Sequence, residues 1–194
     1  MALPRLQRTD ALIVVDVQND FCPGGALPIE QGDRVVPVLN RWIEAARNGG
    51  ARIVVTRDWH PADHISFRER GGPWPAHCVQ NTWGAEMRPD LKLPEDVLLL
   101  SKGTTPDRDD YSDFEMTGLA EELKKNGIRR VWVGGLAQDM CVRATVLDGL
   151  RKGFEVHLIL NATRPVNALP GAGDRAHEEM RAAGCVIEAE QNHA

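Results

Sequence analysis

The stretch ALIVVDVQNDFCPGGAL, residues 11–27, contains the segment that decides the fold. It opens with an apolar run, Ala11–Val17, in which apolar and polar residues do not alternate strictly. Strands that are buried on both faces of a parallel sheet have this pattern, because neither face meets water. The run therefore predicts a strand with the acidic residue Asp16 at its end.

Five further runs have the same character, and helical segments separate them. One segment carries Val35, Leu39 and Trp42 on a single face, and Asp139 is placed to cap the helix that holds Cys141. Alternating strands and helices predict an α/β fold: a mostly parallel six-stranded sheet with helices on both faces, in a Rossmann-like three-layer arrangement. The five runs are Arg52–Arg57, Val97–Ser101, Arg130–Gly134, Glu155–Leu160 and Cys185–Glu188.

The composition argues against several classes of partner. The chain has 194 residues, 42% of them hydrophobic, so residues 1–194 are expected to form a single domain around one core. Its net charge is −5 and its Lys and Arg residues are scattered, which argues against binding to nucleic acid or anionic lipid. The negative net charge is more compatible with binding of a small neutral or cationic molecule. The oligomeric state stays open, with a homo-oligomer among the options.

The ends and the cysteines of the chain indicate its compartment. The amino terminus, MALPRLQRTD, has no apolar run of signal-peptide length, and no stretch approaches the roughly 20 apolar residues that span a bilayer. We therefore expect a cytoplasmic protein without a membrane segment. The cysteines at positions 22, 78, 141 and 185 lie far apart in a chain too long to need disulfide cross-links, which leaves a thiol available for catalysis.

One connection is much longer than the others. It runs from Asp58 to Asp96 and contains three histidines, three tryptophans and five prolines. This stiff, aromatic composition differs from that of a disordered linker, and long loops in compact domains are usually functional. We expect this segment to form a wall of an active site.

Four chemically reactive side chains are predicted to meet at one edge of the sheet. Asp16, Asp58 and Lys102 end the first three strands, and Cys141 opens the helix after the fourth. The carboxyl ends of parallel strands are where ligands bind in open α/β sheets. Each residue alone has an ordinary structural explanation, but their joint placement favours catalysis.

Cys141 is the candidate nucleophile. Near the start of a helix, unpaired N–H groups and the positive end of the helix dipole stabilise a thiolate, and Lys102 would lower the thiol pKa further. Asp16 can accept the thiol proton and return it to a leaving amine. We therefore expect an acidified thiol and a trio of nucleophile, cation and acid/base.

The D-x-H pattern of Asp58 and His60 predicts a metal site. An extended backbone places residues two apart on the same side, and His77 can return to them as a third ligand. Two histidines and one carboxylate suit Zn²⁺, Fe²⁺ or Mn²⁺. His64 is the nearest competing ligand, or else a residue behind the ligands or in the substrate pocket. Cys78 is set aside, because directly adjacent residues rarely point at one ion.

Five motifs cover almost the whole chain and together resemble one family. That family is the nicotinamidase/pyrazinamidase branch of the isochorismatase-like cysteine hydrolases. Its wider relatives share the Asp, Lys and Cys positions, whereas D-W-H-P and W-P-x-H mark the metal-using nicotinamidases. The motifs are residues 11–27, TRDWHPADHISF at 56–67, WPAHCVQNTWGAE at 74–86, SKGT at 101–104 and GGLAQDMCV at 134–142.

The resemblance implies a reaction and a cofactor. Nicotinamide would be hydrolysed to nicotinate and ammonia through a cysteine thioester, with pyrazinamide as a further substrate and a place in NAD salvage. One divalent metal ion would bind the pyridine nitrogen, directly or through water. The identity of the metal, the preference among nicotinamide analogues and the source of the hydrolytic water stay open. The resemblance places Asp16, Lys102 and Cys141 at catalytic positions, Asp58, His60 and His77 at metal positions, and Phe21, Trp74 and Tyr111 around the substrate ring.

The family also implies a cis peptide bond before the nucleophile, here at Leu136–Ala137. It would turn the Ala137 N–H toward the substrate oxygen, and with the N–H of Cys141 it would form an oxyanion hole. Gln138 and Met140 stand where relatives more often have Thr and an aromatic residue or His. We expect this difference to alter the shape of the pocket and not the type of reaction.

Three other functions fit some of the same residues. A different isochorismatase-like hydrolase or amidase would use the same nucleophile on another substrate, and absence of bound metal would favour it. A non-haem iron oxygenase would use two histidines and one carboxylate, but would leave Cys141, Lys102 and Asp16 without a role. A non-catalytic metal-binding or scaffold protein would release no ammonia.

Overall fold

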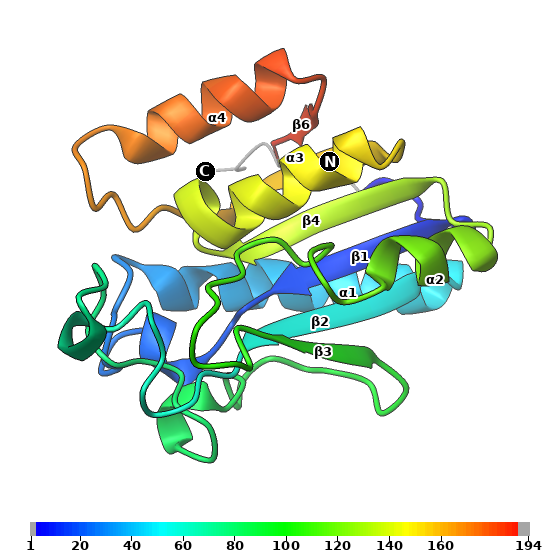
Figure 1. The fold of residues 1–194 in the computed structure, drawn as a ribbon. Coiled ribbons are helices and arrows are strands. Elements are labelled where there is room, and N and C mark those ends of the chain that lie inside the picture. The colour runs from blue at the N-terminus through cyan, green and yellow to red at the C-terminus, as the bar shows by residue number, and fades with distance from the viewer. Residues whose placement is uncertain (1–2, 190–194) are drawn as a thin grey trace.

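A computed structural model describes residues 3–189 and is built on one six-stranded parallel sheet with the strand order β3-β2-β1-β4-β5-β6 (Figure 1). The fold class predicted from the apolar runs is confirmed. The strands are β1 Asp10–Val15, β2 Arg52–Asp58, β3 Leu98–Lys102, β4 Arg130–Leu136, β5 Glu155–Arg164 and β6 Val186–Glu188.

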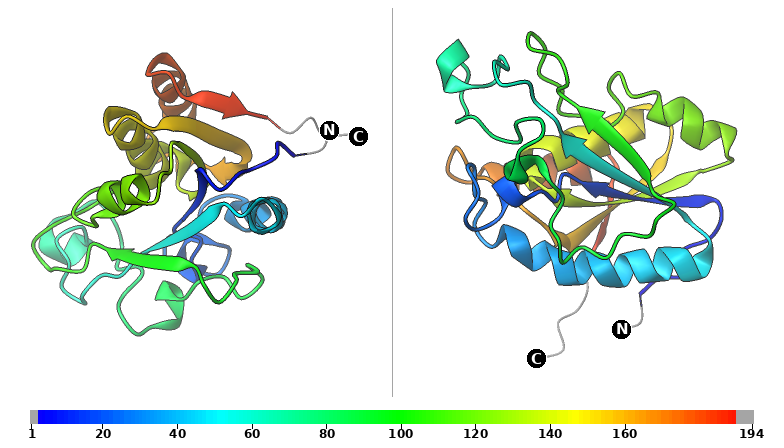
Figure 2. Two further views of the ribbon diagram at one scale, coloured as in Figure 1. Left: turned by 90° about the vertical axis from the view of Figure 1, so that its right-hand side faces the viewer. Right: turned by 90° about the horizontal axis from the view of Figure 1, so that it is seen from below.

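Helices cover both faces of the sheet (Figure 2). Leu12 and Val14 of β1 join the core under α1 (Val35–Gly49), whereas Ile13 and Val15 join the core under the other three helices. This alternation follows from the two-residue repeat of a strand. The other helices are α2 Leu119–Lys125, α3 Arg143–Arg151 and α4 Ala172–Ala182; short 3₁₀ turns lie at Asn19–Phe21, Gly32–Arg34, Arg68–Arg70 and Trp83–Ala85, and a π-helical turn at Gln138–Val142. Within residues 3–189 no helix is both long and apolar enough to cross a membrane.

The strand order reverses at β1. The chain passes from β1 over one face to β2 and β3, then returns through α2 to place β4 on the other side of β1. At such a switch point the connections leave in opposite directions and open a crevice beyond the carboxyl ends of the strands. The segments that follow β1 and β4 therefore border this crevice.

The strand ends differ from the predicted ones where the backbone turns sharply. β1 stops at Val15 because Asp16 has a φ of 48°, outside the extended region. β4 continues beyond the predicted end at Gly134, through Gly135, whose φ is 134°. A Cβ atom at Gly135 would lie 2.0 Å from the carbonyl oxygen of Val15, so only glycine fits this close approach of β4 to β1.

Candidate functional site

Lys102 connects the groups that the sequence places at the strand ends. Its ammonium group is buried at the end of β3 and donates hydrogen bonds to Oδ2 of Asp16, to Oδ1 of Asp58 at 2.6 Å and to Sγ of Cys141 at 3.4 Å. All four side chains are buried, with at most 5% of each residue exposed. The structure therefore brings together four residues that lie far apart along the chain, since even Lys102 and Cys141, the two nearest in sequence, are 39 positions apart.

The buried charges shift the pKa values of the two carboxyl groups in opposite directions. Burial raises the pKa of Asp16 to about 6, although the attraction of Lys102 opposes the shift. Burial also disfavours the charge on Asp58, yet Lys102 and His60 hold its pKa well below the usual range. One carboxylate is thus permanently ionised, whereas the other exchanges a proton near neutral pH, as an acid/base group requires.

The environment of Cys141 differs from the predicted one. Cys141 lies in the π-helical turn that leads into α3, and burial raises the pKa of its thiol well above 9, with Asp58 and Asp16 adding to the shift and Lys102 opposing it. The expectation of an acidified thiol is wrong, because desolvation of the thiolate outweighs the single nearby cation. If this sulfur is the nucleophile, its proton would have to leave as it attacks.

Asp139 does not cap the helix that follows it. Its carboxylate oxygens instead accept the N–H groups of Val166 at 2.8 Å and Asn167 at 2.9 Å, in the segment after β5. This contact ties the nucleophile turn to the loop that carries Val166. The Asp139 side chain thus shapes the crevice and does not accept hydrogen bonds from the unpaired N–H groups at the start of the helix.

Asp58, His60 and His77 form a compact set of metal donors. Their ligand atoms lie within 4.8 Å of one another, and all three residues are buried. Nδ1 of His60 pairs with the carbonyl oxygen of Gly103 at 3.0 Å, and Nδ1 of His77 with that of Pro75 at 2.8 Å. If each Nδ1 carries the proton that these carbonyls accept, each Nε2 presents a lone pair, which is how metal-binding histidines are oriented. The donor set fits a divalent ion such as Zn²⁺.

His64 stands behind this set. Its ring stacks on His60 with centroids 4.0 Å apart, and its two nitrogens contact the Ser66 hydroxyl at 2.7 Å and the Arg108 carbonyl oxygen at 2.8 Å. Both nitrogens are therefore engaged, and His64 does not line the cavity described next. Its ring thus packs behind that of His60, and its predicted roles as a metal ligand or a residue of the substrate pocket stay predictions.

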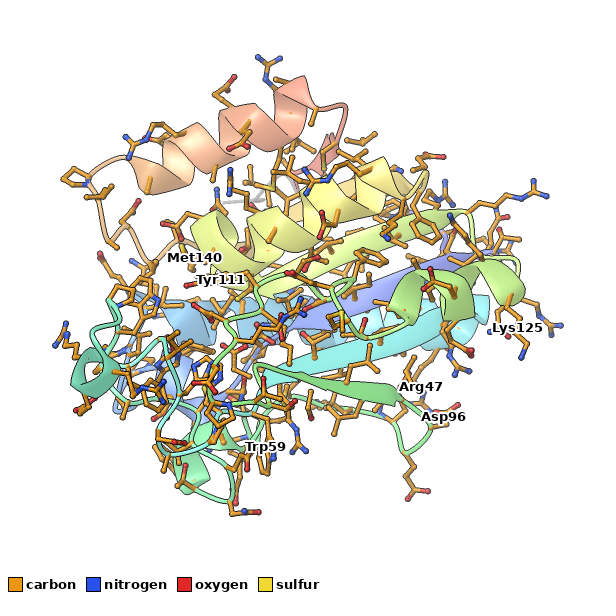
Figure 3. The ribbon with its side chains drawn as sticks, viewed as in Figure 1. Arg47, Trp59, Asp96, Tyr111, Lys125 and Met140 are labelled. Carbon is orange, nitrogen blue, oxygen red and sulfur yellow. The ribbon has the colours of Figure 1, made fainter. Side chains whose placement is uncertain are left out.

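A cavity opens beside Cys141 and the metal donors. Trp74 and Tyr111 are joined across it by a hydrogen bond of 3.2 Å from the indole N–H to the phenolic oxygen. Figure 3 shows Tyr111 next to Met140 at the end of the sheet where β4 finishes, far from Arg47 and Asp96. The peptide bond between Leu136 and Ala137 is cis. The lining residues are Phe21, Leu27, Asp58, Trp74, His77, Tyr111, Ala137, Met140, Cys141 and Val166.

Three polar residues that hold the site in place were not predicted. The side-chain amide of Gln18 donates to the carbonyl oxygen of Asp58 at 2.8 Å and accepts its N–H at 2.8 Å. The Thr56 hydroxyl donates to Oδ1 of Asp16 at 2.9 Å, and the Asp20 carboxylate accepts the N–H of Cys78, next to His77, at 2.7 Å. The only sequence signal for them is a polar residue beside or within an apolar run.

Comparison with known proteins identifies close relatives over the whole domain. The model of the isochorismatase domain family matches residues 10–191. The chain is 39% identical to the nicotinamidase of Escherichia coli K12, over 91% of this chain and 93% of that one. Its structure matches that of the Pyrococcus horikoshii pyrazinamidase solved in complex with zinc, with a TM-score of 0.89 and 53% identity over 94% and 99% of the two chains. A protein from L. infantum, solved in complex with nicotinate, matches with a TM-score of 0.85 and 35% identity over 98% of this chain and 100% of that one.

Proposed function

This chain belongs to the isochorismatase family, and we propose on that premise that it is a nicotinamidase, which hydrolyses nicotinamide to nicotinate and ammonia. One observation carries the proposal. The ammonium group of Lys102 contacts the candidate nucleophile Cys141, the acid/base Asp16 and the metal donor Asp58, and both Cys141 and Asp58 line one cavity. A hydrolase that acts on an amide needs these groups at one place.

The chain's metal donors set the position of the substrate ring. Asp58, His60 and His77 would hold one divalent ion, which when bound would supply a Lewis acid to orient the ring through its pyridine nitrogen, directly or through water. Phe21, Trp74 and Tyr111 are proposed to contact the ring itself, since all three line the cavity. Pyrazinamide has a nitrogen at the equivalent ring position, so we propose it as a second substrate.

Cys141 and Asp16 carry out the first half of the reaction. The sulfur attacks the carboxamide carbon while Asp16 takes the thiol proton, because the thiol is protonated at rest and Asp16 titrates near neutral pH. Lys102 holds Asp16 and contacts the sulfur, so its positive charge stabilises the anion that forms. The N–H groups of Ala137 and Cys141 are proposed to bind the tetrahedral oxyanion.

Collapse of the tetrahedral species completes the cycle. Asp16 returns the proton to the leaving nitrogen, and ammonia departs to leave a thioester on Cys141. Water then attacks the thioester carbon, Asp16 accepts a proton from it, and nicotinate leaves as the thiol is restored. Each step moves one proton through the same carboxyl group, which the structure places beside Lys102 in a site with at most 5% exposure.

An ammonia-release assay tests the proposal. Nicotinamide should yield one equivalent each of ammonia and nicotinate, and chelation followed by removal of metal should abolish turnover until Zn²⁺, Fe²⁺ or Mn²⁺ is restored. Turnover of nicotinamide that survives complete removal of metal would contradict the metal assignment. Absence of ammonia from the metal-loaded protein would contradict the activity and favour another isochorismatase-like substrate.

We also infer further properties of the protein as a whole. Residues 1–194 form a single isochorismatase-like hydrolase domain, which is supported by one continuous sheet and by a family match over residues 10–191. The protein works in the cytoplasm, which is supported by four cysteines that are all free and buried. Its partner is a small-molecule substrate, and the reaction places it where nicotinamide is recycled toward pyridine nucleotides.

A further inference from the structure

The carboxylate of Asp20 joins two segments of the site. Asp20 lies in the turn Asn19–Phe21 after β1, and only 7% of the residue is exposed. Its Oδ2 accepts the N–H of Cys78 at 2.7 Å, and its Oδ1 accepts the N–H of Ala26 at 2.9 Å. The segments after β1 and after β2, which contain these residues, lie side by side in Figure 1, in blue and in blue-green. A Cβ atom at Gly84 would lie 2.1 Å from Oδ2, so the carboxylate packs directly on a glycine backbone. None of the steps proposed above uses this carboxylate.

The backbone of Cys78 connects Asp20 to both histidine donors. His77 precedes Cys78 in the chain, and the carbonyl oxygen of Cys78 accepts the N–H of His60 at 2.9 Å. Cys78 has a φ of 46°, which a residue with a side chain rarely adopts and which the surrounding structure must support. The hydrogen bond to Asp20 gives that support, because it fixes the peptide group between His77 and Cys78. The carboxylate therefore acts, through one residue, on the positions of both histidines.

Asp20 also holds a wall of the substrate cavity. In addition to the bond from Ala26 to Oδ1, the carbonyl oxygen of Asp20 accepts the N–H of Leu27 at 3.0 Å. Leu27 lines the cavity, as does Phe21, the residue that follows Asp20. The ring of Phe21 in turn lies 5.6 Å from that of His77. The same residue thus contacts the cavity wall on one side and the segment of the histidine donors on the other.

We propose that Asp20 is a positioning residue that orders the metal donors and the wall of the substrate cavity as one unit. The inference rests on the proposed function, which supplies the metal and the substrate ring. Hydrogen bonds to a carboxylate are stronger than those between neutral groups, and residues that orient metal ligands contribute about 10- to 100-fold to metal affinity. Because both contacts share one side chain, metal bound at the histidines should also hold the turn that carries Leu27.

The affinity of the metal-free protein for Zn²⁺ tests the contact with the donors. Asp20→Ala removes both acceptor oxygens, so the peptide group before Cys78 loses its partner. Competition with a chromophoric chelator should show an affinity about tenfold or more below that of the wild type. Equal affinities would reduce Asp20 to a structural residue and overturn the proposal.

Asp139→Ala is the matched control. Asp139 is similarly buried, with 8% exposed, and its carboxylate also accepts two backbone N–H groups. Those groups belong to Val166 and Asn167, in a segment that carries none of the metal donors. Both substitutions should lower the free energy of unfolding, whereas only Asp20→Ala should weaken Zn²⁺ binding. An equal loss of affinity in both variants would trace it to a general loosening of the fold, and would also overturn the proposal.

Kinetics at saturating metal test the contact with the cavity wall. Once the metal site is filled, Asp20→Ala should raise KM for nicotinamide by about threefold or more and change kcat less, because a displaced Leu27 weakens binding of the ring and does not touch Cys141. An unchanged KM would show that Asp20 does not order the wall.

Hydrogen exchange of the wild type tests the coupling without any substitution. Zn²⁺ added to the metal-free protein should slow exchange of the Cys78 N–H by about tenfold or more, and that of the Ala26 N–H with it, since both are bound to Asp20. Slower exchange at Cys78 alone would contradict a single unit. A wild type that binds no Zn²⁺ would contradict the proposed metal site and this proposal with it, whereas Zn²⁺ binding that Asp20→Ala retains in full would contradict this proposal alone.

Discussion

Nζ of Lys102 lies 2.6 Å from Oδ1 of Asp58, so the cation of the proposed catalytic trio is also the partner of a candidate metal donor. The other oxygen of Asp58, Oδ2, lies 3.6 Å from Nε2 of His60. The carboxylate of Asp58 thus contacts Lys102 of the proposed catalytic trio through Oδ1 and faces the histidine metal donors through Oδ2. Substitutions at Asp58 should disturb both functions, whereas substitutions at His60 should disturb mainly metal binding.

His60→Ala should lose metal. Removal of one of three protein donors leaves Asp58 and His77 alone, and affinity should fall by more than about tenfold, since even residues behind the ligands contribute that much. Metal analysis after dialysis against a weak chelator measures the stoichiometry. His177→Ala, on α4, is the control and should retain metal. Equal metal content in the two variants would mean that His60 is not a ligand.

Cys141→Ala should abolish turnover and leave the fold intact. The change removes only a sulfur atom, so the free energy of unfolding should change by about 1 kcal/mol, whereas kcat/KM for nicotinamide should fall about a thousandfold or more. Ammonia release and thermal unfolding are measured on the same samples. Cys185→Ala, at a buried thiol next to β6, should keep full activity. Activity of Cys141→Ala within tenfold of the wild type would rule out covalent catalysis by this residue.

Lys102→Met should destabilise the metal-free protein. It retains much of the side-chain stem but leaves Asp16 and Asp58 buried without a cation, which costs about 3–5 kcal/mol when one partner of a buried ion pair is removed. Chemical denaturation of chelated samples measures the loss. Lys125→Met at the end of α2 should change stability by no more than about 0.5 kcal/mol. A similarly small effect at Lys102 would show that its charge does not hold the site together.

Thr56→Val should shift the acidic limb of the pH profile of kcat/KM to higher pH. Burial raises the pKa of Asp16 to about 6, and the Thr56 hydroxyl opposes that shift by donating to the ionised form. The wild-type kcat/KM should therefore rise with pH through about 6, because Asp16 must be ionised to accept the thiol proton. Loss of one hydrogen bond to a charged group should raise the midpoint by about one pH unit. The midpoint of Thr82→Val, a substitution at an exposed threonine, should stay at the wild-type value.

The sequence predicts that four reactive residues meet at one edge of the sheet, because local patterns of strands and helices predict the direction in which each strand runs. These residues are Asp16, Asp58, Lys102 and Cys141. Buried apolar runs separated by helices predict parallel strands, and parallel strands end at one edge of the sheet. The residue that follows each run is then placed without knowledge of the loops. The same logic misplaced the end of β1, because the turn at Asp16, with its φ of 48°, has no signature in an apolar run.

The return of His77 to the metal donors depends on contacts that no local pattern shows. Asp20, from the segment after β1, accepts the N–H of Cys78, and Gln18 holds the backbone of Asp58. These hydrogen bonds join residues 58 and 40 positions apart. The spacing of the D-x-H pattern predicted that a third ligand would come back, but the polar residues that bring it back were not identified.

The sequence by itself determined the order of strands and helices and the chemical groups at the strand ends, since hydrophobic periodicity and strand polarity act over a few residues. Only the tertiary structure decided the protonation of those groups. Cys141 was expected to be acidic because Lys102 and a helix start were nearby, yet its thiol pKa is raised. Asp113, in the acidic loop before α2, is also fully buried, and burial raises the pKa of its carboxyl group well above the usual range. A pKa depends on desolvation and on charges brought in from distant segments, and both arise only when the chain has folded.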